Sequence, residues 1–244
     1  MAGTKALTVD NVTRRFGGLV AVDAMSFDLY ENEVLGLIGP NGSGKTTMMN
    51  LISGLLGPNA GQIRLYGDEI SGRPAYAIAR SGLARTFQLV RMLPTLTVLE
   101  NVAAGGVFGR ARRWGQGLQD HARTLLAQVG FEGAPEAPVQ TLTYVDQKRV
   151  ELARALAGDP KVLLLDEWLA GLNPTELRTQ ISLIAELRRE GRTIIIVEHV
   201  MDAIRSLCDR CVVMNSGAKI AEGTPKEVLS DREVIRAYLG DSGA

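Results

Sequence analysis

The sequence lacks the features that mark secreted or membrane-spanning chains. Its 244 residues include only two cysteines, Cys208 and Cys211, which are too few for a disulfide framework and favour a cytosolic compartment. No apolar run approaches the length of about 18 residues that a membrane-spanning helix needs. The first residues, MAGTKALTVD, contain no charged segment followed by an apolar run, so we expect no secretory signal.

An excess of charge of one sign is also missing. Lys+Arg and Asp+Glu both number 27, which gives a formal net charge of zero. No overall field that would draw in nucleic acid or anionic lipid is therefore indicated, and we expect no nucleic-acid partner. Apolar residues make up 45% and charged residues 22%, close to the average for globular domains and enough for a sizeable core.

Two kinds of strand pattern are present. Residues 25–30 and 63–66 alternate between apolar and polar side chains, which is typical of antiparallel strands with one wet face. Residues 34–38, 162–165 and 193–197 are nearly continuous apolar runs, which suit parallel strands covered on both faces. Helical segments separate these runs. The sequence predicts an α/β fold with a parallel-sheet core and an N-terminal antiparallel β subdomain.

The helices can also be placed. Residues from about 91 to 158 contain no convincing buried strand and predict a helical insertion, with helices at 120–129 and 146–157. A further helix is expected at 174–190, with Asn173 as its N-cap and Gly191 past its end. Thr224 and Glu227 form a capping-box pattern that begins a short helix after a turn at 215–217. We interpret residues 1–244 as one domain carrying this insertion.

One glycine-rich segment matches the phosphate-binding pattern G-x-x-x-x-G-K-[ST], between the strand at 34–38 and an expected helix at 45–56. Glycines let backbone N–H groups surround a phosphate chain, and the N-terminus of the helix adds positive potential. Lys45 is expected to reach the β- and γ-phosphates of ATP, and the hydroxyl of Thr46 to bind Mg²⁺. The predicted nucleotide-binding residues are Gly39, Pro40, Asn41, Gly42, Ser43, Gly44, Lys45, Thr46 and Thr47.

Three further polar residues follow buried strands. Asp166 ends the run 162–165, where a carboxylate can hold the magnesium shell. Glu167 comes next, and a bend at the end of the strand would let it face the γ-phosphate and polarise a water. His199 follows the strand at 193–197, at the edge where ligands of open α/β sheets bind, and could donate a hydrogen bond to the γ-phosphate.

These motifs, together with the segment 170–174, resemble the ATP-binding-cassette (ABC) ATPases over residues 7 to 240. The resemblance implies that Gln88 contacts magnesium and the attacking water and reports to a membrane subunit. It implies that Phe16 stacks on adenine, although a core role for Phe16 stays open. It also places Asn173 in a loop that contacts a second ATPase subunit.

Segments at 78–80, 83–88 and 96–102, and the endings 223–225 and 234–240, are similar to the ATPase subunits of branched-chain amino-acid importers. This resemblance implies a second ATPase subunit, two membrane-spanning permease subunits and a periplasmic solute-binding protein. It implies a peripheral location on the cytoplasmic face of the inner membrane. Lipopolysaccharide-export ATPases share part of the ending, so export stays an alternative. No residue here would contact the transported solute.

The sequence departs from the family pattern at the LSGGQ segment, which closes over the partner subunit's ATP. Thr143, Tyr144, Val145 and Asp146 stand there, and Val145 replaces a glycine. A β-branched residue resists φ > 0 and crowds a backbone approach to phosphate, so we expect a weakened lid. Position 168 is Trp where Pro is usual.

Two other classes stay open, a soluble regulatory cassette protein and a small-molecule P-loop kinase. The first usually carries paired cassettes or long coiled-coil insertions, and the second gives no reason for His199 or for the segment 170–174. Cys208 and Cys211 are interpreted as packing residues, since no further ligand for a metal is visible. The basic run 110–114 is interpreted as a solvated loop, with contact to a membrane subunit or to lipid headgroups as the alternative.

Overall fold

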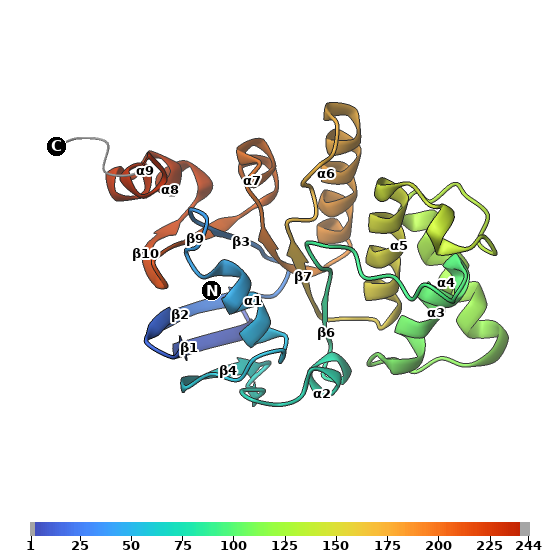
Figure 1. The fold of residues 1–244 in the computed structure, drawn as a ribbon, viewed down its shortest axis with the longest axis horizontal. Helices are drawn as coiled ribbons and strands as arrows, with labels where there is room; N and C mark the ends of the chain where they lie inside the picture. The colour runs from blue at the N-terminus through green and yellow to red at the C-terminus, as the bar shows by residue number, and fades with distance from the viewer. Residues whose placement is uncertain (1–2, 240–244) are drawn as a thin grey trace. The chain divides into compact units, whose positions relative to one another are not determined.

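The computed structural model describes residues 3–239 and contains two compact units (Figure 1). The first unit comprises the chain up to Ala75 together with the residues from Leu169 onward, and the second comprises Tyr76–Trp168. Among the described residues, no helix is both long enough and apolar enough to cross a membrane. The predicted similarity at 234–240 reaches Gly240, which lies outside the described residues.

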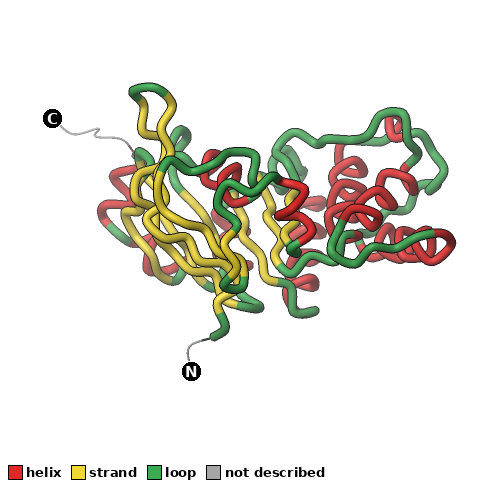
Figure 2. Tube along the Cα trace, turned by 90° about the horizontal axis from the view of Figure 1, so that it is seen from below, coloured by secondary structure: helices red, strands yellow, loops and turns green. Residues whose placement is uncertain are grey.

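An antiparallel sheet forms one layer of the first unit, as the alternating patterns predicted. Its strands lie in the order β2-β1-β4-β5. Figure 2 shows its long strands in yellow. The alternating pattern covered only residues 25–30 in this part of the chain, but β1 and β2 have 12 residues each, because bulges let the pairing continue past the polar positions. The strands are β1 (Lys5–Phe16), β2 (Leu19–Tyr30), β4 (Ala60–Leu65) and β5 (Asp68–Glu69).

A second layer of the first unit contains β3 (Val34–Ile38) between β8 (Thr193–Val197) and β9 (Arg210–Asn215), all parallel. Every residue of β3 and β8 is buried, which explains their continuous apolar sequence. β10 (Ala218–Gly223) pairs antiparallel with β9 across a turn in which Ser216 and Gly217 have φ of 48° and 85°. The parallel core and the predicted hairpin are thus confirmed.

The helices of the first unit begin where their capping signals predicted. Asn173 caps α6 (Pro174–Arg189), and Thr224 caps α8 (Pro225–Ser230), each with the reciprocal glutamate contact of a capping box. Helix α1 was predicted to reach residue 56 but ends at Ile52, since Gly54 leaves the helix with φ of 74°. The remaining helices are α1 (Lys45–Ile52), α7 (Met201–Leu207) and α9 (Arg232–Leu239).

The two cysteines pack against β3. A Cβ atom added to Gly36 would lie 3.0 Å from each sulfur, so the thiols occupy the space that a side chain at position 36 would need. Both thiols are buried and unbridged. Their mutual hydrogen bond, followed by burial, raises the pKa of Cys208, which keeps it protonated and unreactive. The packing interpretation is confirmed.

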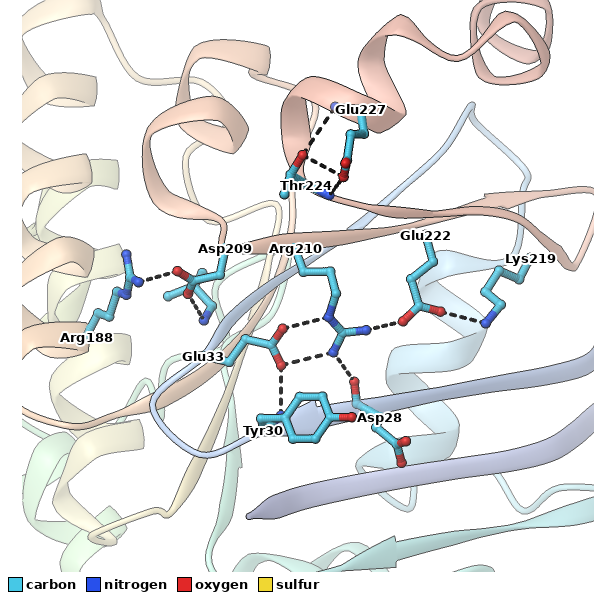
Figure 3. Close-up of polar contacts among 11 residues, drawn as sticks. Asp28, Tyr30, Glu33, Arg188, Asp209, Arg210, Lys219, Glu222, Thr224 and Glu227 are labelled. Carbon is cyan, nitrogen blue, oxygen red and sulfur yellow. Dashed lines mark hydrogen bonds and ion pairs between the residues drawn. The ribbon is translucent and has the colours of Figure 1, made fainter. Parts of the chain in front are cut away.

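Arg210 of β9 joins the two layers of the first unit (Figure 3). Its guanidinium pairs with Glu33 at 2.8 Å, donates to the carbonyl of Asp28 on β2 at 2.5 Å, and pairs with Glu222 on β10. Burial opposes its charge, but Glu33 and Glu222 outweigh that cost and raise the pKa of Arg210. One cation therefore ties β2, β9 and β10 together.

The second unit has a parallel strand pair and a group of helices. β6 (Leu83–Arg85) pairs parallel with β7 (Val162–Asp166). Figure 2 shows its helices in red, and α3, α4 and α5 pack against one another. Two of them begin earlier than predicted, α4 at Gly115 and α5 at Tyr144, because Trp114 and Thr143 take the extended N-cap conformation. The helices are α2 (Ala75–Arg80), α3 (Val98–Phe108), α4 (Gly115–Gln128), the short 3₁₀ helix η1 (Val139–Thr141) and α5 (Tyr144–Ala157).

Candidate functional site: a phosphate loop and an acidic pair

The phosphate loop joins β3 to α1 in the first unit, and its backbone requires glycine. Gly39, Gly42 and Gly44 have φ of 152°, 79° and 103°. A Cβ atom at Gly39 would lie 2.1 Å from the carbonyl oxygen of Met214, and one at Gly44 would lie 2.4 Å from that of Ala21. At positions 39 and 44 any other residue would collide with neighbouring backbone, and at Gly42 the positive φ alone disfavours a side chain, so the loop holds a conformation that favours glycine.

The polar groups of this loop point inward. The ammonium of Lys45, whose residue is 6% exposed, donates to the carbonyl oxygens of Gly39 at 2.8 Å and Pro40 at 2.9 Å. The hydroxyl of Ser43 is buried and has no hydrogen-bond partner. An orphaned buried hydroxyl is costly unless a ligand satisfies it. An inward-facing cation, this hydroxyl and the N-terminus of α1 together fit a phosphate group.

Other predicted residues of the first unit lie near strand ends or in the first turn of α1. Phe16 ends β1 and is 42% exposed, so the core alternative is wrong. The guanidinium of Arg14 lies 4.7 Å from the centre of its ring. His199 is exposed directly after β8. Thr46 is exposed in the first turn of α1, and Thr47 beside it is half-buried.

Asp166 ends β7 in the second unit and is 2% exposed. Its Oδ2 pairs with Arg85 of β6 at 2.6 Å, and burial lowers the pKa of this arginine. Its Oδ1 is buried without a hydrogen-bond partner. A carboxyl group with one oxygen that lacks a hydrogen-bond partner suits a hydrated Mg²⁺, which prefers one or two carboxylates together with phosphate oxygens. The residue present therefore fits the predicted metal.

Glu167 lies at a sharp bend, as the sequence predicted. Its φ is 48°, a conformation that costs a residue with a side chain about 1–2 kcal/mol. Strain of this kind is typical of functional positions. The amide of Gln88 donates to Oε2 of Glu167 at 2.6 Å. The structure thus brings together two of the residues expected to handle the attacking water.

The LSGGQ-like segment begins α5. Thr143 is the N-cap and accepts from the backbone N–H of Asp146 at 3.2 Å. Tyr144 and Val145 lie in the first helical turn, and neither has positive φ. The expectation that Val145 must resist φ > 0 is therefore wrong, because this part of the segment is helical. Only the bulk of the isopropyl group remains as a reason for a weakened lid.

Sequence reasoning missed several buried charged residues that contact the segments carrying these groups. Glu198 is 1% exposed and accepts from the backbone N–H of Leu169 at 2.6 Å. Arg85 was noted only as part of a similar segment, without a role. Lys148 and Glu151 of α5 are 2% and 1% exposed. For Lys148 and Glu151, the only available signal was a charged residue on the apolar face of a predicted helix.

Comparison with known proteins agrees with this geometry. Residues 22–170 match the family described as ABC transporter. The chain belongs to the ABC transporter ATP-binding proteins. Its C-terminal residues 218–244 also match the family described as Branched-chain amino acid ATP-binding cassette transporter.

Curated relatives cover nearly the whole chain. It is 40% identical to the high-affinity branched-chain amino acid transport ATP-binding protein LivG of Escherichia coli, over 97% of this chain and 98% of that one. BraF of Pseudomonas aeruginosa, described in the same words, is equally similar over the same shares. The lipopolysaccharide export system ATP-binding protein LptB of Escherichia coli is 34% identical, over 96% and 97%.

Solved structures share the fold. A nucleotide-free ATP-binding cassette from an ABC transporter superposes with a TM-score of 0.87 and 29% identity, over 97% of this chain and all of that one. The ADP conformation of MJ1267, another such cassette, gives 0.87 and 30%, over 97% and 99%. A dimeric post-hydrolysis state of the cassette MJ0796, bound to ADP and Pi, gives 0.81 and 25%, over 90% and 98%.

Proposed function

We propose that this chain is the Mg²⁺-dependent ATP-hydrolysing subunit of a membrane transporter for the uptake of branched-chain amino acids. The observation that carries the ATPase is the glycine-only loop of Gly39, Gly42 and Gly44, with Lys45 and the unsatisfied hydroxyl of Ser43 facing inward. The solute class is supported by the C-terminal family match and by relatives at 40% identity.

The phosphate chain of ATP is bound by backbone N–H groups of the loop and by Lys45, whose ammonium exchanges its contacts with Gly39 and Pro40 for phosphate oxygens. Phe16 stacks on the adenine. Thr46, Asp166 and Gln88 would hold the magnesium ion, which would supply positive charge beside the phosphates.

Hydrolysis depends on positioning and on charge. The Glu167 carboxylate orients a water toward the γ-phosphate and takes its proton, and Gln88 fixes the orientation of that carboxylate. His199 donates to the γ-phosphate as charge develops on its oxygens. The meeting of these groups around one nucleotide stays a prediction.

We place the chain at the cytoplasmic face of the inner membrane, with a second ATPase subunit, two permease subunits and a periplasmic solute-binding protein. Two ATP molecules lie between the ATPase subunits, and Thr143, Tyr144, Val145 and Asp146 face the partner's ATP. The dimeric cassette MJ0796 supports the pairing of ATPase subunits. With Val145 in place of a glycine, we favour a partner that carries an intact segment.

Export of lipopolysaccharide is the second candidate, because LptB is 34% identical over 96% of the chain. Uptake of radiolabelled leucine by cells that lack this gene separates the two functions. Loss of uptake with an intact outer membrane supports import, whereas defective lipopolysaccharide export with normal uptake refutes it.

The ATPase is tested with Glu167→Gln, which keeps the shape of the side chain but removes the base. We expect the hydrolysis rate to fall by about 10²–10⁴-fold while Mg²⁺–ATP binding, measured by calorimetry, is retained. Glu186→Gln, at an exposed carboxylate of α6, is the control and should hydrolyse ATP normally. An unchanged rate in Glu167→Gln, or wild-type protein that does not take up Mg²⁺–ATP, would remove the proposal.

A further inference from the structure

Two buried charges on α5 have no role in the site described so far. Lys148 and Glu151 lie one turn apart on the helix, and both are nearly inaccessible to solvent. Charges buried to this extent are costly unless they find partners. Both contact backbone groups of loops. Glu151 contacts the loop that carries Gln88, on both sides of that residue, and Lys148 contacts the loop that carries Glu167.

Glu151 holds the loop that carries Gln88. Its Oε2 accepts from the backbone N–H of Phe87 at 3.3 Å, and its Oε1 accepts from that of Arg91 at 3.0 Å. Burial raises the pKa of Glu151, and these two N–H groups act against the rise. Because the two donors flank Gln88, one carboxylate fixes the backbone on both sides of the glutamine.

A second layer supports this contact. Arg154 lies 3.7 Å from Oε1 of Glu151 and donates to the carbonyl oxygen of Arg91. Arg154 also donates at 3.3 Å to the side chain of Asn101, which is fully buried and accepts from the backbone N–H of Leu93 at 2.9 Å. The loop after Gln88 is therefore tied to α5 and α3 along its length.

Lys148 holds the residue after Glu167. Its ammonium donates to the carbonyl oxygen of Trp168 at 2.8 Å. In return, the indole N–H of Trp168 donates to the carbonyl oxygen of Lys148 at 3.4 Å. A proline at position 168 has no indole N–H, so this reciprocal contact belongs to a chain with tryptophan there. The Trp168 side chain is fully buried against α5.

We propose that Glu151 and Lys148 are positioning residues that set Gln88 against Glu167. Helix α5 fixes both loops, and the contact of 2.6 Å between Gln88 and Glu167 closes the ring of interactions. Because the same helix begins with the LSGGQ-like segment, a shift of that segment moves both anchors together. The proposal rests on the proposed ATPase function. It assigns the alignment of Gln88 and Glu167 to residues that contact neither ATP nor the attacking water.

The kinetic test compares Glu151→Gln with Val150→Ala in the full chain. The glutamine has one oxygen and serves only one of the two N–H groups. We expect kcat for ATP hydrolysis to fall about 10- to 100-fold, with KM for ATP within twofold, because the phosphate loop is unchanged. Val150 is fully buried on the same helix without polar contacts, so Val150→Ala weakens packing but should leave kcat within twofold. A similar loss of kcat in both variants would overturn the proposal.

A double-mutant comparison separates positioning from general damage. If Glu151 and Lys148 act through Gln88, then Glu151→Gln and Lys148→Met should each lower kcat in the wild-type chain but have no further effect beside Gln88→Ala. Losses that add to that of Gln88→Ala would contradict the proposal. If Glu151→Gln does not fold, Glu151→Asp keeps the charge with a shorter reach and takes its place in both comparisons.

Hydrogen exchange tests the contacts of Glu151 independently of ATPase activity. The amides of Phe87 and Arg91 should exchange faster in Glu151→Gln than in Val150→Ala, since each donates to the carboxylate. Equal rates in the two variants would rule out the anchoring. If the wild-type chain had no ATPase activity but the two variants still differed in exchange, the proposed function would be wrong and the contacts of Glu151 with the loop would stand.

Discussion

The two units hold their functional groups by different means. In the first unit the phosphate loop is a backbone structure, because three glycines take conformations that other residues avoid and two of them, Gly39 and Gly44, face neighbouring carbonyl groups. In the second unit buried side chains do the holding. Arg85 pairs with Asp166 across 81 positions of sequence, and Glu151 reaches Phe87 across 64. A backbone-built site depends on local spacing, whereas a side-chain-built site depends on residues that only the fold brings together.

Alanine substitutions in the phosphate loop should give the largest loss of unfolding free energy where the new Cβ atom overlaps neighbouring backbone. Gly39→Ala places a Cβ atom 2.1 Å from the oxygen of Met214, whereas Gly42→Ala meets nothing within 4 Å and is strained only by its φ of 79°. We expect a loss of unfolding free energy of about 3 kcal/mol or more for Gly39→Ala, against about 1–2 kcal/mol for Gly42→Ala. Urea titration measures both. Equal losses would mean that overlap with the backbone does not shape the loop.

Arg210→Met tests whether side-chain contacts also stabilise the first unit. The variant keeps the apolar stem but leaves Glu33 and Glu222 without their shared cation. Since the arginine side chain is 20% exposed, we expect a loss of about 1–3 kcal/mol of unfolding free energy, less than for a fully buried pair. Arg189→Met, at an exposed position of α6, should change stability by less than about 0.5 kcal/mol. A result for Arg210→Met as small as the control would make the contrast between the units sharper.

Val145→Gly tests the bulk of one side chain in the second unit. In the assembled transporter we expect a higher ATPase rate, by less than about tenfold, because the isopropyl group no longer crowds the partner's phosphate. Val145→Ala keeps the Cβ atom and should give an intermediate rate. An unchanged rate in the glycine variant would mean that this segment is no weakened lid.

Asn173→Ala should give the smallest effect. Its side chain accepts from the backbone N–H groups of Thr175 and Glu176, both at 3.0 Å. Loss of an N-cap of this kind costs about 1 kcal/mol of unfolding free energy. Thr175→Ala lies in the same exposed turn, and its side chain does not cap the helix, so its stability should stay within about 0.5 kcal/mol of wild type. Equal values for the two variants would show that the cap adds nothing to α6.

The same contrast explains what the sequence could predict. The phosphate loop, the acidic residue at the end of β7 and the caps of α6 and α8 depend on neighbours within a few positions, so local patterns located them. The bend at Glu167 was also expected, because a strand ended there.

The remaining features depend on tertiary contacts. The partner of Arg85 and the roles of Lys148 and Glu151 could not be predicted, since their contacts lie tens of residues away. The end of α1 was set four residues too late, because an apolar run continued past a glycine that leaves the helix. The backbone of Val145 was misjudged because the start of α5 was placed after it.

Gly36 and the two cysteines have a consequence for sequence change in this chain. A Cβ atom at position 36 would lie 3.0 Å from each sulfur atom, so a larger residue there requires the two sulfur atoms to shift or to be replaced by smaller groups. Serine or alanine at 208 and 211 would make that room. A residue bulkier than cysteine at either position would crowd Gly36, which has no side chain that could be shortened. The C-x-x-C spacing, often a sign of redox chemistry, here places two thiols, one at the end of α7 and one in β9, in the space beside Gly36 of β3.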